Sequence, residues 1–173
     1  IDVDTNNEIP TKYSIELNAH SLSRYAKIVQ DYEMVPIVEP EVLMDGAHDI
    51  DTCYEITSNV LKKVFEALDK QNVYLGGILL KPNMVISGKK CEQQASVDEV
   101  STMTLKCLNE NVPKEVPGIV FLSGGQSNEL ATQHLNQMNK DSKGTEWNIS
   151  FSYGRALQQP CLSSWMGSDS NIE

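Results

Sequence analysis

Apolar positions along the chain alternate between helical spacing and short continuous runs. Four stretches place apolar residues three and four positions apart, which gathers them on one face of a helix, near 21–30, 52–70, 96–108 and 127–138. Apolar runs of strand length alternate with them, at 35–38, 73–80, 118–122 and 147–152. A last short helical piece is predicted at 155–165, interrupted by Pro160.

This alternation favours an α/β fold. Strands that read as nearly continuous apolar runs and alternate with helices are typical of parallel strands buried on both faces. Four such units fit either an open doubly wound sheet or part of a (β/α)8 TIM barrel. No G-x-G-x-x-G motif follows a predicted strand, which counts against the dinucleotide-binding version of the open sheet.

Length and charge exclude several classes of protein. The chain has 173 residues, which fits one domain, and its 24 acidic and 14 basic side chains give a formal net charge of −10. That charge argues against binding to nucleic acid or to an anionic membrane. No apolar run approaches the roughly 18–20 residues of a membrane helix, and no basic-then-apolar leader is expected. We therefore expect no nucleic acid and no membrane as partners.

The cysteines suggest a reducing compartment. They are widely spaced and match no zinc pattern, at Cys53, Cys91, Cys107 and Cys161. We expect four reduced structural thiols in a cytoplasmic protein, with a disulfide or a metal site as the less favoured alternative.

Two glutamates follow the first predicted strand. Side chains alternate faces along a strand, so Glu39 and Glu41 are expected to point the same way, into one pocket. The alternative is that both are solvated loop carboxylates.

Lys81 ends the second apolar run, after Gly77-Ile78-Leu79-Leu80. A lysine at this place is costly to desolvate as a cation, so burial is expected to lower its pKa and expose the free amine that attacks carbonyl groups. The alternative is a strand-end lysine whose ammonium group reaches solvent.

Small residues follow the third and fourth strands. Ser123-Gly124-Gly125 would let backbone amides approach an anion at the start of the next helix. Ser152-Tyr153-Gly154-Arg155 repeats this pattern and adds a guanidinium group that suits phosphate. Each motif alone is as well explained by an ordinary turn, but two after consecutive strands favour a phosphate site.

Taken together, four motifs resemble class I fructose-bisphosphate aldolases, in the order of that family and along nearly the whole chain. They are Val-Pro-Ile-Val-Glu-Pro-Glu (35–41), Leu-Leu-Lys-Pro-Asn-Met-Val (79–85), Phe-Leu-Ser-Gly-Gly-Gln-Ser (121–127) and Phe-Ser-Tyr-Gly-Arg-Ala-Leu-Gln (151–158). The resemblance implies a TIM barrel of which residues 1–173, a single partial domain, supply about strands five to eight. The loop at 45–49 also resembles the family, although Ala47 replaces a usual acidic residue.

The resemblance also implies roles for individual residues. Lys81 would be the Schiff-base lysine, Glu39 the acid/base carboxylate and Glu41 a second carboxylate that orients the lysine. The substrate phosphate would be bound by Ser123, Gly124, Gly154 and Arg155. The family uses no metal and no cofactor, and it cleaves fructose 1,6-bisphosphate to two triose phosphates in glycolysis.

Partners and alternatives follow from the same resemblance. It implies a phosphorylated sugar as substrate and a homotetramer. One alternative is a non-catalytic scaffold that binds actin or other cytoskeletal proteins, and another is a Schiff-base lyase for a different phosphorylated substrate. Because a (β/α)8 barrel typically needs about 250 residues, this chain is expected to be inactive by itself.

Overall fold

Helices and strands alternate along the chain as the apolar pattern predicts. The computed structural model describes residues 1–142, 145 and 147–172. The strands are β1 (Ile37–Val38), β2 (Leu79–Leu80), β3 (Gly118–Phe121) and β4 (Asn148–Phe151). The helices are α1 (Lys12–Asp31), α2 (Ile50–Lys70), α3 (Val97–Asn111), α4 (Asn128–Asp141) and α5 (Arg155–Trp165). Short 3-10 turns lie at Thr5–Asn7, Leu75–Gly77 and Asp169–Asn171.

The four strands form one parallel sheet in the order β1-β2-β3-β4. Spatial order equals chain order, and a helix joins each pair of neighbours. An open doubly wound sheet would reverse its order at a switch point, whereas consecutive parallel neighbours are the arrangement of a barrel wall. The structure therefore confirms the α/β fold and favours part of a TIM barrel over the doubly wound alternative.

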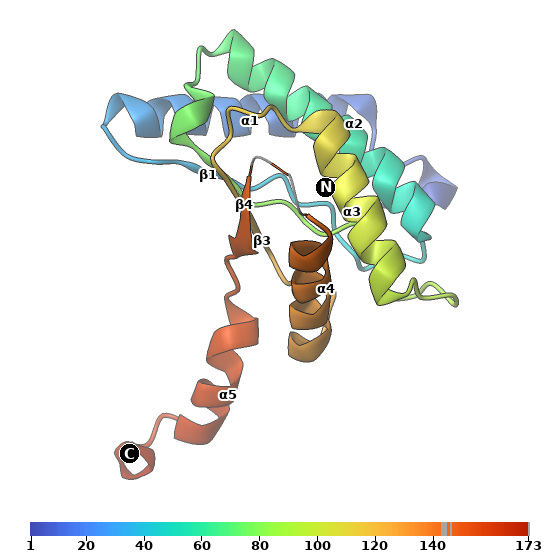
Figure 1. The fold of residues 1–173 in the computed structure, drawn as a ribbon, viewed down its shortest axis with the longest axis vertical. Coiled ribbons are helices and arrows are strands. Elements are labelled where there is room, and N and C mark those ends of the chain that lie inside the picture. The colour runs from blue at the N-terminus through green and yellow to red at the C-terminus, as the bar shows by residue number, and fades with distance from the viewer. Residues whose placement is uncertain (143–144, 146, 173) are drawn as a thin grey trace.

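Side-chain caps fix where the helices begin. The side chains of Thr11, Asp49 and Ser127 accept backbone N–H bonds at the starts of α1, α2 and α4. At α3, Ser96 and Glu99 form the predicted capping box. Successive helices α1 to α4 contact one another, and Figure 1 shows α1 and α2 lying together at one end of the molecule.

The core lies between these helices and one face of the sheet. Val38, Leu80 and Ile119 are aligned across β1, β2 and β3 and are fully buried on that face. On the opposite face, Ile37 is 40% exposed. Leu79 and Val120 on that face are half-buried. The prediction that the strands are buried on both faces is therefore wrong for the described residues, whose helices cover one face of β1 and leave Ile37 uncovered on the other.

Two predicted boundaries and one predicted interruption also change. Helix α1 begins at Lys12 rather than near residue 21, and its first turns bury Ile15 and Ala19. The run at 73–80 is mostly not strand, because Leu75–Gly77 forms a 3-10 turn. Helix α5 continues through Pro160, whose ring costs it one backbone bond without ending it.

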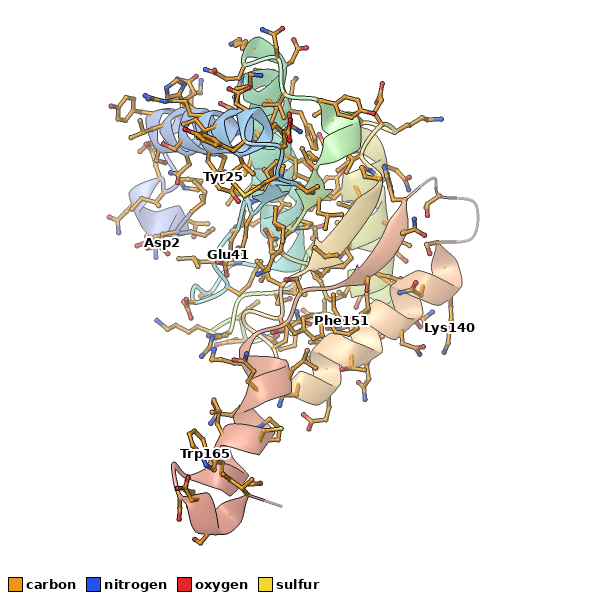
Figure 2. All side chains as sticks on the ribbon, turned by 90° about the vertical axis from the view of Figure 1, so that its left-hand side faces the viewer. Asp2, Tyr25, Glu41, Lys140, Phe151 and Trp165 are labelled. Carbon is orange, nitrogen blue, oxygen red and sulfur yellow. The ribbon has the colours of Figure 1, made fainter. Side chains whose placement is uncertain are left out.

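Helix α5 extends away from the other elements, as Figures 1 and 2 both show. Its apolar side chains are uncovered, with Leu157 53%, Leu162 50% and Trp165 43% exposed. Among the described residues, no helix is both long and apolar enough to cross a membrane.

Candidate active site

The ends of β1 and β2 bring Glu39 and Lys81 together. Val38 and Leu80 are partners in the parallel register, so the residues that follow them leave the sheet side by side. The Lys81 backbone N–H donates to the Val38 carbonyl at 2.7 Å. Beyond this anchor, Lys81 Nζ lies 3.0 Å from Glu39 Oε1.

The Lys81 side chain is mostly covered and is paired with a charge. It is 20% exposed, whereas the Glu39 side chain is 42% exposed. The expected apolar surroundings are therefore incomplete, because the Glu39 carboxylate lies beside the amine. The two groups are close enough for a proton to pass directly between the Lys81 amine and the Glu39 carboxylate.

Glu41 lies nearer to the third strand. Its Oε1 would be 3.0 Å from a Cβ atom built at Gly124, so the carboxylate abuts the loop that follows β3. Glu39 and Glu41 both line a cavity of about 140 Å³ bounded by α1 and α2. The two carboxylates nevertheless have different neighbours, since Glu39 forms an ion pair with Lys81 and Glu41 lies against Gly124. Figure 2 marks Glu41 beside the sheet.

Asn83 joins the two segments that carry these groups. Its Oδ1 accepts the Val42 N–H at 3.0 Å, and its Nδ2 donates to Thr57 Oγ1 and to the Met84 carbonyl, both at 3.1 Å. Asn83 is only 2% exposed. It therefore fixes the backbone after Glu41 relative to the backbone after Lys81.

A separate cavity gathers the predicted anion-binding side chains. It encloses about 400 Å³ and is lined by both Ser123 and Arg155, from the segments after β3 and β4. Gly124 and Gly154 do not line it. Gly124 packs against Glu41, and Gly154 is the residue before α5 with open space around it.

The cavity also contains residues that the sequence reasoning missed, among them Lys89 and Gln126. Gln126 accepts a hydrogen bond from His134 Nδ1 at 2.6 Å, with its amide nitrogen directed at Met84 Sδ at 3.5 Å. His134 is 2% exposed, and burial lowers its pKa. The sequence had shown His134 only as one position on the apolar face of a helix.

The loop at 123–126 has a conformation that needs glycine. Gly125 has a φ of +82°, and a Cβ atom there would lie 2.6 Å from Met44 Cβ. The side chain of Gln126 then holds the end of the loop between Met84 and His134. The segment after β3 is therefore fixed at both ends.

Other titratable groups lie away from these strand ends. Burial raises the pKa of Cys53 and of Cys107 to about 11, so both thiols stay protonated. All four cysteines are free, and no cluster of three potential metal ligands occurs in the part of the chain that the structure describes.

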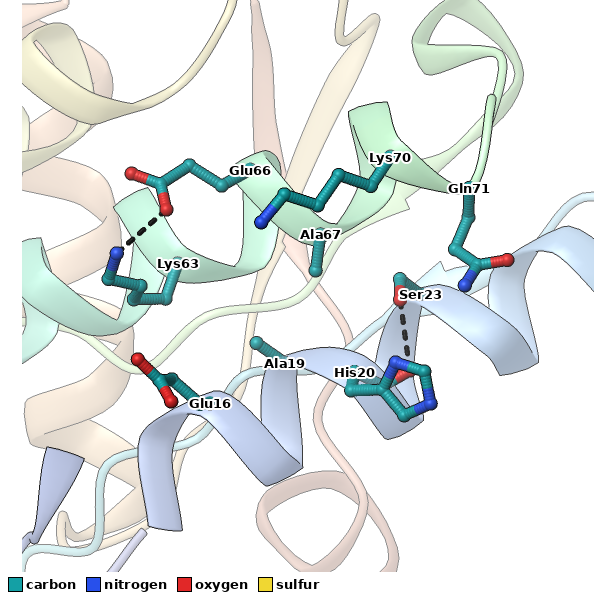
Figure 3. A pocket seen from close by; sticks show the side chains of 9 residues that line it. All are labelled: Glu16, Ala19, His20, Ser23, Lys63, Glu66, Ala67, Lys70 and Gln71. Carbon is teal, nitrogen blue, oxygen red and sulfur yellow. Dashed lines mark hydrogen bonds and ion pairs between the residues drawn. The ribbon is translucent and has the colours of Figure 1, made fainter. Parts of the chain in front are cut away.

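A further cavity of about 360 Å³ lies between α1 and α2, and Figure 3 shows its lining. Small side chains, including Ala19 and Ala67, form its floor, and Lys63 pairs with Glu66 at 2.7 Å on its edge. None of the predicted site residues lines it. It is a groove between packed helices. Of its two lysines, Lys63 is paired with a carboxylate and Lys70 is exposed.

Comparison with known proteins agrees with this geometry. The family model described as "Fructose-bisphosphate aldolase class-I" matches residues 2–173. A probable fructose-bisphosphate aldolase class 1 of Xanthomonas campestris is 54% identical over 163 residues, which are 94% of this chain and 48% of the relative. Fructose-bisphosphate aldolase B of Gallus gallus is 48% identical over 162 residues, which are 94% of this chain and 44% of the relative.

The fold is similar to a solved structure as well. The fructose-bisphosphate aldolase from Plasmodium falciparum, in complex with TRAP and a small-molecule inhibitor, superposes with a TM-score of 0.94 at 46% identity. The match covers 98% of this chain and 49% of that chain. This chain thus spans about half the length of the relatives that it matches.

Proposed function

The chain belongs to the class I fructose-bisphosphate aldolase family, and we propose that it carries the Schiff-base half of an active site that cleaves fructose 1,6-bisphosphate to dihydroxyacetone phosphate and glyceraldehyde 3-phosphate. The observation that carries the proposal is the pair of Lys81 Nζ and Glu39 Oε1, 3.0 Å apart at the ends of adjacent strands.

Lys81 is the proposed nucleophile. Its neutral amine attacks the substrate ketone to give a carbinolamine, and loss of water gives a protonated imine. A base takes the proton of the hydroxyl group on the departing carbon, and the neighbouring carbon–carbon bond breaks with its electron pair moving to the imine, which leaves an enamine and an aldehyde. Protonation of the enamine and hydrolysis of the imine then release the second product and the free lysine.

Glu39 is the proposed acid and base. It lies close enough to take the ammonium proton of Lys81 and to return a proton to the departing hydroxyl of the carbinolamine. Glu41 is the proposed orienting carboxylate, supported by its place beside Gly124 at the next strand.

The cavity lined by Ser123 and Arg155 is the proposed phosphate site. A guanidinium group and polar loop groups can hold a phosphate and so fix the sugar relative to the amine. Gly124 and Gly154 lie next to these two residues in the chain, and we propose that their backbones contribute once the substrate is bound. No metal or cofactor is part of this proposal.

We further propose that activity needs strands beyond the four present here. Among the residues that the structure describes, β1 and β4 each have one edge without a strand partner, and Ile37 is exposed on one face of the sheet. A closed barrel would pair those edges and cover that face. We call a protein that joins this segment to the remaining strands the complete-barrel protein, and residues 1–173 are then one partial domain of it.

A homotetramer in the cytoplasm is the proposed state of that protein. The location is supported by four cysteines that are free in the structure, as expected in a reducing compartment. The tetramer rests on the family resemblance, and the mass of the native protein tests it.

A scaffold role is the less favoured alternative. The Plasmodium relative was solved in complex with TRAP, so a family member can hold a protein partner. However, a scaffold does not need a lysine that is 80% covered and paired with a carboxylate at a strand end, whereas a Schiff-base enzyme does.

The test is cleavage of fructose 1,6-bisphosphate by the complete-barrel protein, followed by a coupled assay of triose phosphate. Lys81→Met should abolish cleavage, and Lys106→Met, which removes an exposed lysine on α3, should leave it unchanged. Cleavage that survives Lys81→Met would refute the proposal. Competition between fructose 1,6-bisphosphate and other phosphorylated sugars separates it from a Schiff-base lyase of different substrate.

A further inference from the structure

We propose that Lys89 is a second cationic residue of the phosphate site, held by Asp45 until a phosphate group replaces that carboxylate. The inference rests on the proposed function, since it concerns the site of the same substrate. It assigns a binding role to a residue outside the motifs that carry the family resemblance.

The first observation is the charge of the cavity. Lys89 and Arg155 both line its volume of about 400 Å³, and the other lining residues, all uncharged, are Ser123, Gly125, Gln126, Asn128, Ala156 and Gln159. The whole chain has a formal net charge of −10, and the groove between α1 and α2 includes Glu16 and Glu66. This cavity therefore differs from the groove between α1 and α2, because it has two cationic lining residues and no acidic one. Such a lining suits a dianion.

The second observation is that the backbone of Lys89 has a fixed position. Three backbone hydrogen bonds join its loop to the loop after β1: Gly88 N–H to the His48 carbonyl at 2.9 Å, Lys89 N–H to the Met44 carbonyl at 2.8 Å, and Lys90 N–H to the Gly46 carbonyl at 3.0 Å. Gly88 permits this approach, since a Cβ atom there would lie 2.3 Å from the Gly46 oxygen. The backbone of Lys89 is thus held at the edge of the cavity by two loops bonded to each other.

The third observation concerns the present partner of Lys89. Its Nζ lies 2.8 Å from Asp45 Oδ1, and the side chains are 52% and 62% exposed. The ammonium group lowers the pKa of Asp45. Because both groups are well solvated, the pair is easily exchanged, and a phosphate dianion offers the lysine more charge than one carboxylate does.

Arg155 has no such competitor among the described residues, where no carboxylate lies within ion-pair distance of it. Arg155 would therefore receive the phosphate first, and Lys89 would leave Asp45 to complete the contact. Asp45 weakens binding in this scheme, because it competes for the ammonium group and repels the incoming anion.

Lys90 provides a matched control. It follows Lys89 directly and is also exposed, but it lines a different cavity, with Asp2 and Asp4. Loss of either lysine changes the net charge equally. A difference in phosphate affinity between the Lys89 and Lys90 variants therefore reports the place of the lost lysine and not the change in net charge.

The experiment measures binding of inorganic phosphate to the complete-barrel protein by calorimetry, and KM for fructose 1,6-bisphosphate in parallel. Lys89→Met should weaken phosphate binding and raise KM about fivefold with kcat within about twofold, and Lys89→Arg should restore both. Lys90→Met should change neither by more than about 1.5-fold, and Asp45→Asn should tighten phosphate binding about twofold.

Equal effects of Lys89→Met and Lys90→Met would overturn the inference, as would an absence of phosphate binding in the unsubstituted protein. Because phosphate binding does not require cleavage, the two claims fail separately. A protein that cleaves the sugar through Lys81 but is indifferent to Lys89→Met refutes the role of Lys89 alone. A protein that binds phosphate through Lys89 but cleaves no sugar refutes the proposed function alone.

Discussion

Lys81 Nζ lies 3.0 Å from Glu39 Oε1, and this pair is the direct result of the parallel register in which Val38 opposes Leu80. A shift of one residue in either strand would turn one of the two side chains to the opposite face of the sheet. The chemistry proposed for the chain thus depends on how β1 and β2 are aligned.

Glu39→Gln tests the acid/base role. The amide keeps the size of the side chain but cannot take a proton from Lys81, so kcat in the complete-barrel protein should fall about 10²–10³-fold with little change in KM. Steady-state kinetics on fructose 1,6-bisphosphate measure both. Glu115→Gln, at an exposed loop position, is the control. Equal kcat in Glu39→Gln and the control would show that another group moves the proton.

Asn83→Ala tests how the site segments are held. The change leaves the buried Val42 N–H without its acceptor and removes two donated bonds, so the free energy of unfolding should fall by about 2–3 kcal/mol. Urea denaturation measures the loss. Asn139→Ala removes an amide that donates to the Leu135 carbonyl from an exposed helical position, and it should cost far less. Similar losses in the two variants would contradict the role of Asn83.

His134 predicts how stability depends on pH. Burial lowers the pKa of His134 below its ordinary value of 6.5, so below that pH the unfolded chain binds a proton that the folded chain resists. Stability should therefore decrease as pH falls through 6.5 towards the lowered pKa. His134→Gln should reduce this slope, because it removes the buried imidazole. Thermal melts between pH 5 and 7.5 (about the range where histidine titrates) would show it.

His48 should add to the same slope, since the residue is 5% exposed and burial lowers its pKa as well. A pH–stability profile that is unchanged by His134→Gln would mean that the imidazole takes up its proton without leaving the folded state.

The 173-residue segment should show no cleavage of fructose 1,6-bisphosphate by itself. In the described part of the segment the sheet has two open edges, and the face that exposes Ile37 would form the inside of a closed barrel. Assay of the purified segment beside the complete-barrel protein tests this expectation. Measurable turnover by the segment, abolished by Lys81→Met, would show that four strands suffice.

The sequence predicts those features of the fold that depend on local residue patterns, such as the order of the elements and the start of a helix. Apolar spacing located the helices and strands in order, and Ser96 with Glu99 marked the start of α3 correctly. It missed the first turns of α1, where Ile15 and Ala19 are buried but Tyr13 and Leu17 are exposed, so apolar residues do not mark one face. It also predicted burial of both sheet faces, since a pattern of apolar residues does not say how many layers cover them.

The candidate site shows the same limit. The four motifs brought Lys81, Glu39 and Arg155 to attention because those motifs follow strands. Lys89 and the His134–Gln126 bond were missed because each depends on two segments meeting in space, the loops after β1 and β2 in one case and α4 with the segment after β3 in the other. Register and loop pairing are tertiary facts, which residue spacing alone does not determine.

Trapping of the Schiff base tests the central claim most directly. The complete-barrel protein is incubated with dihydroxyacetone phosphate, reduced with borohydride and digested, and its peptides are weighed by mass spectrometry. The account predicts one stable adduct, on Lys81, that is absent from Lys81→Met and retained in Lys90→Met. An adduct on a different lysine, or none in a protein that still cleaves fructose 1,6-bisphosphate, would contradict it.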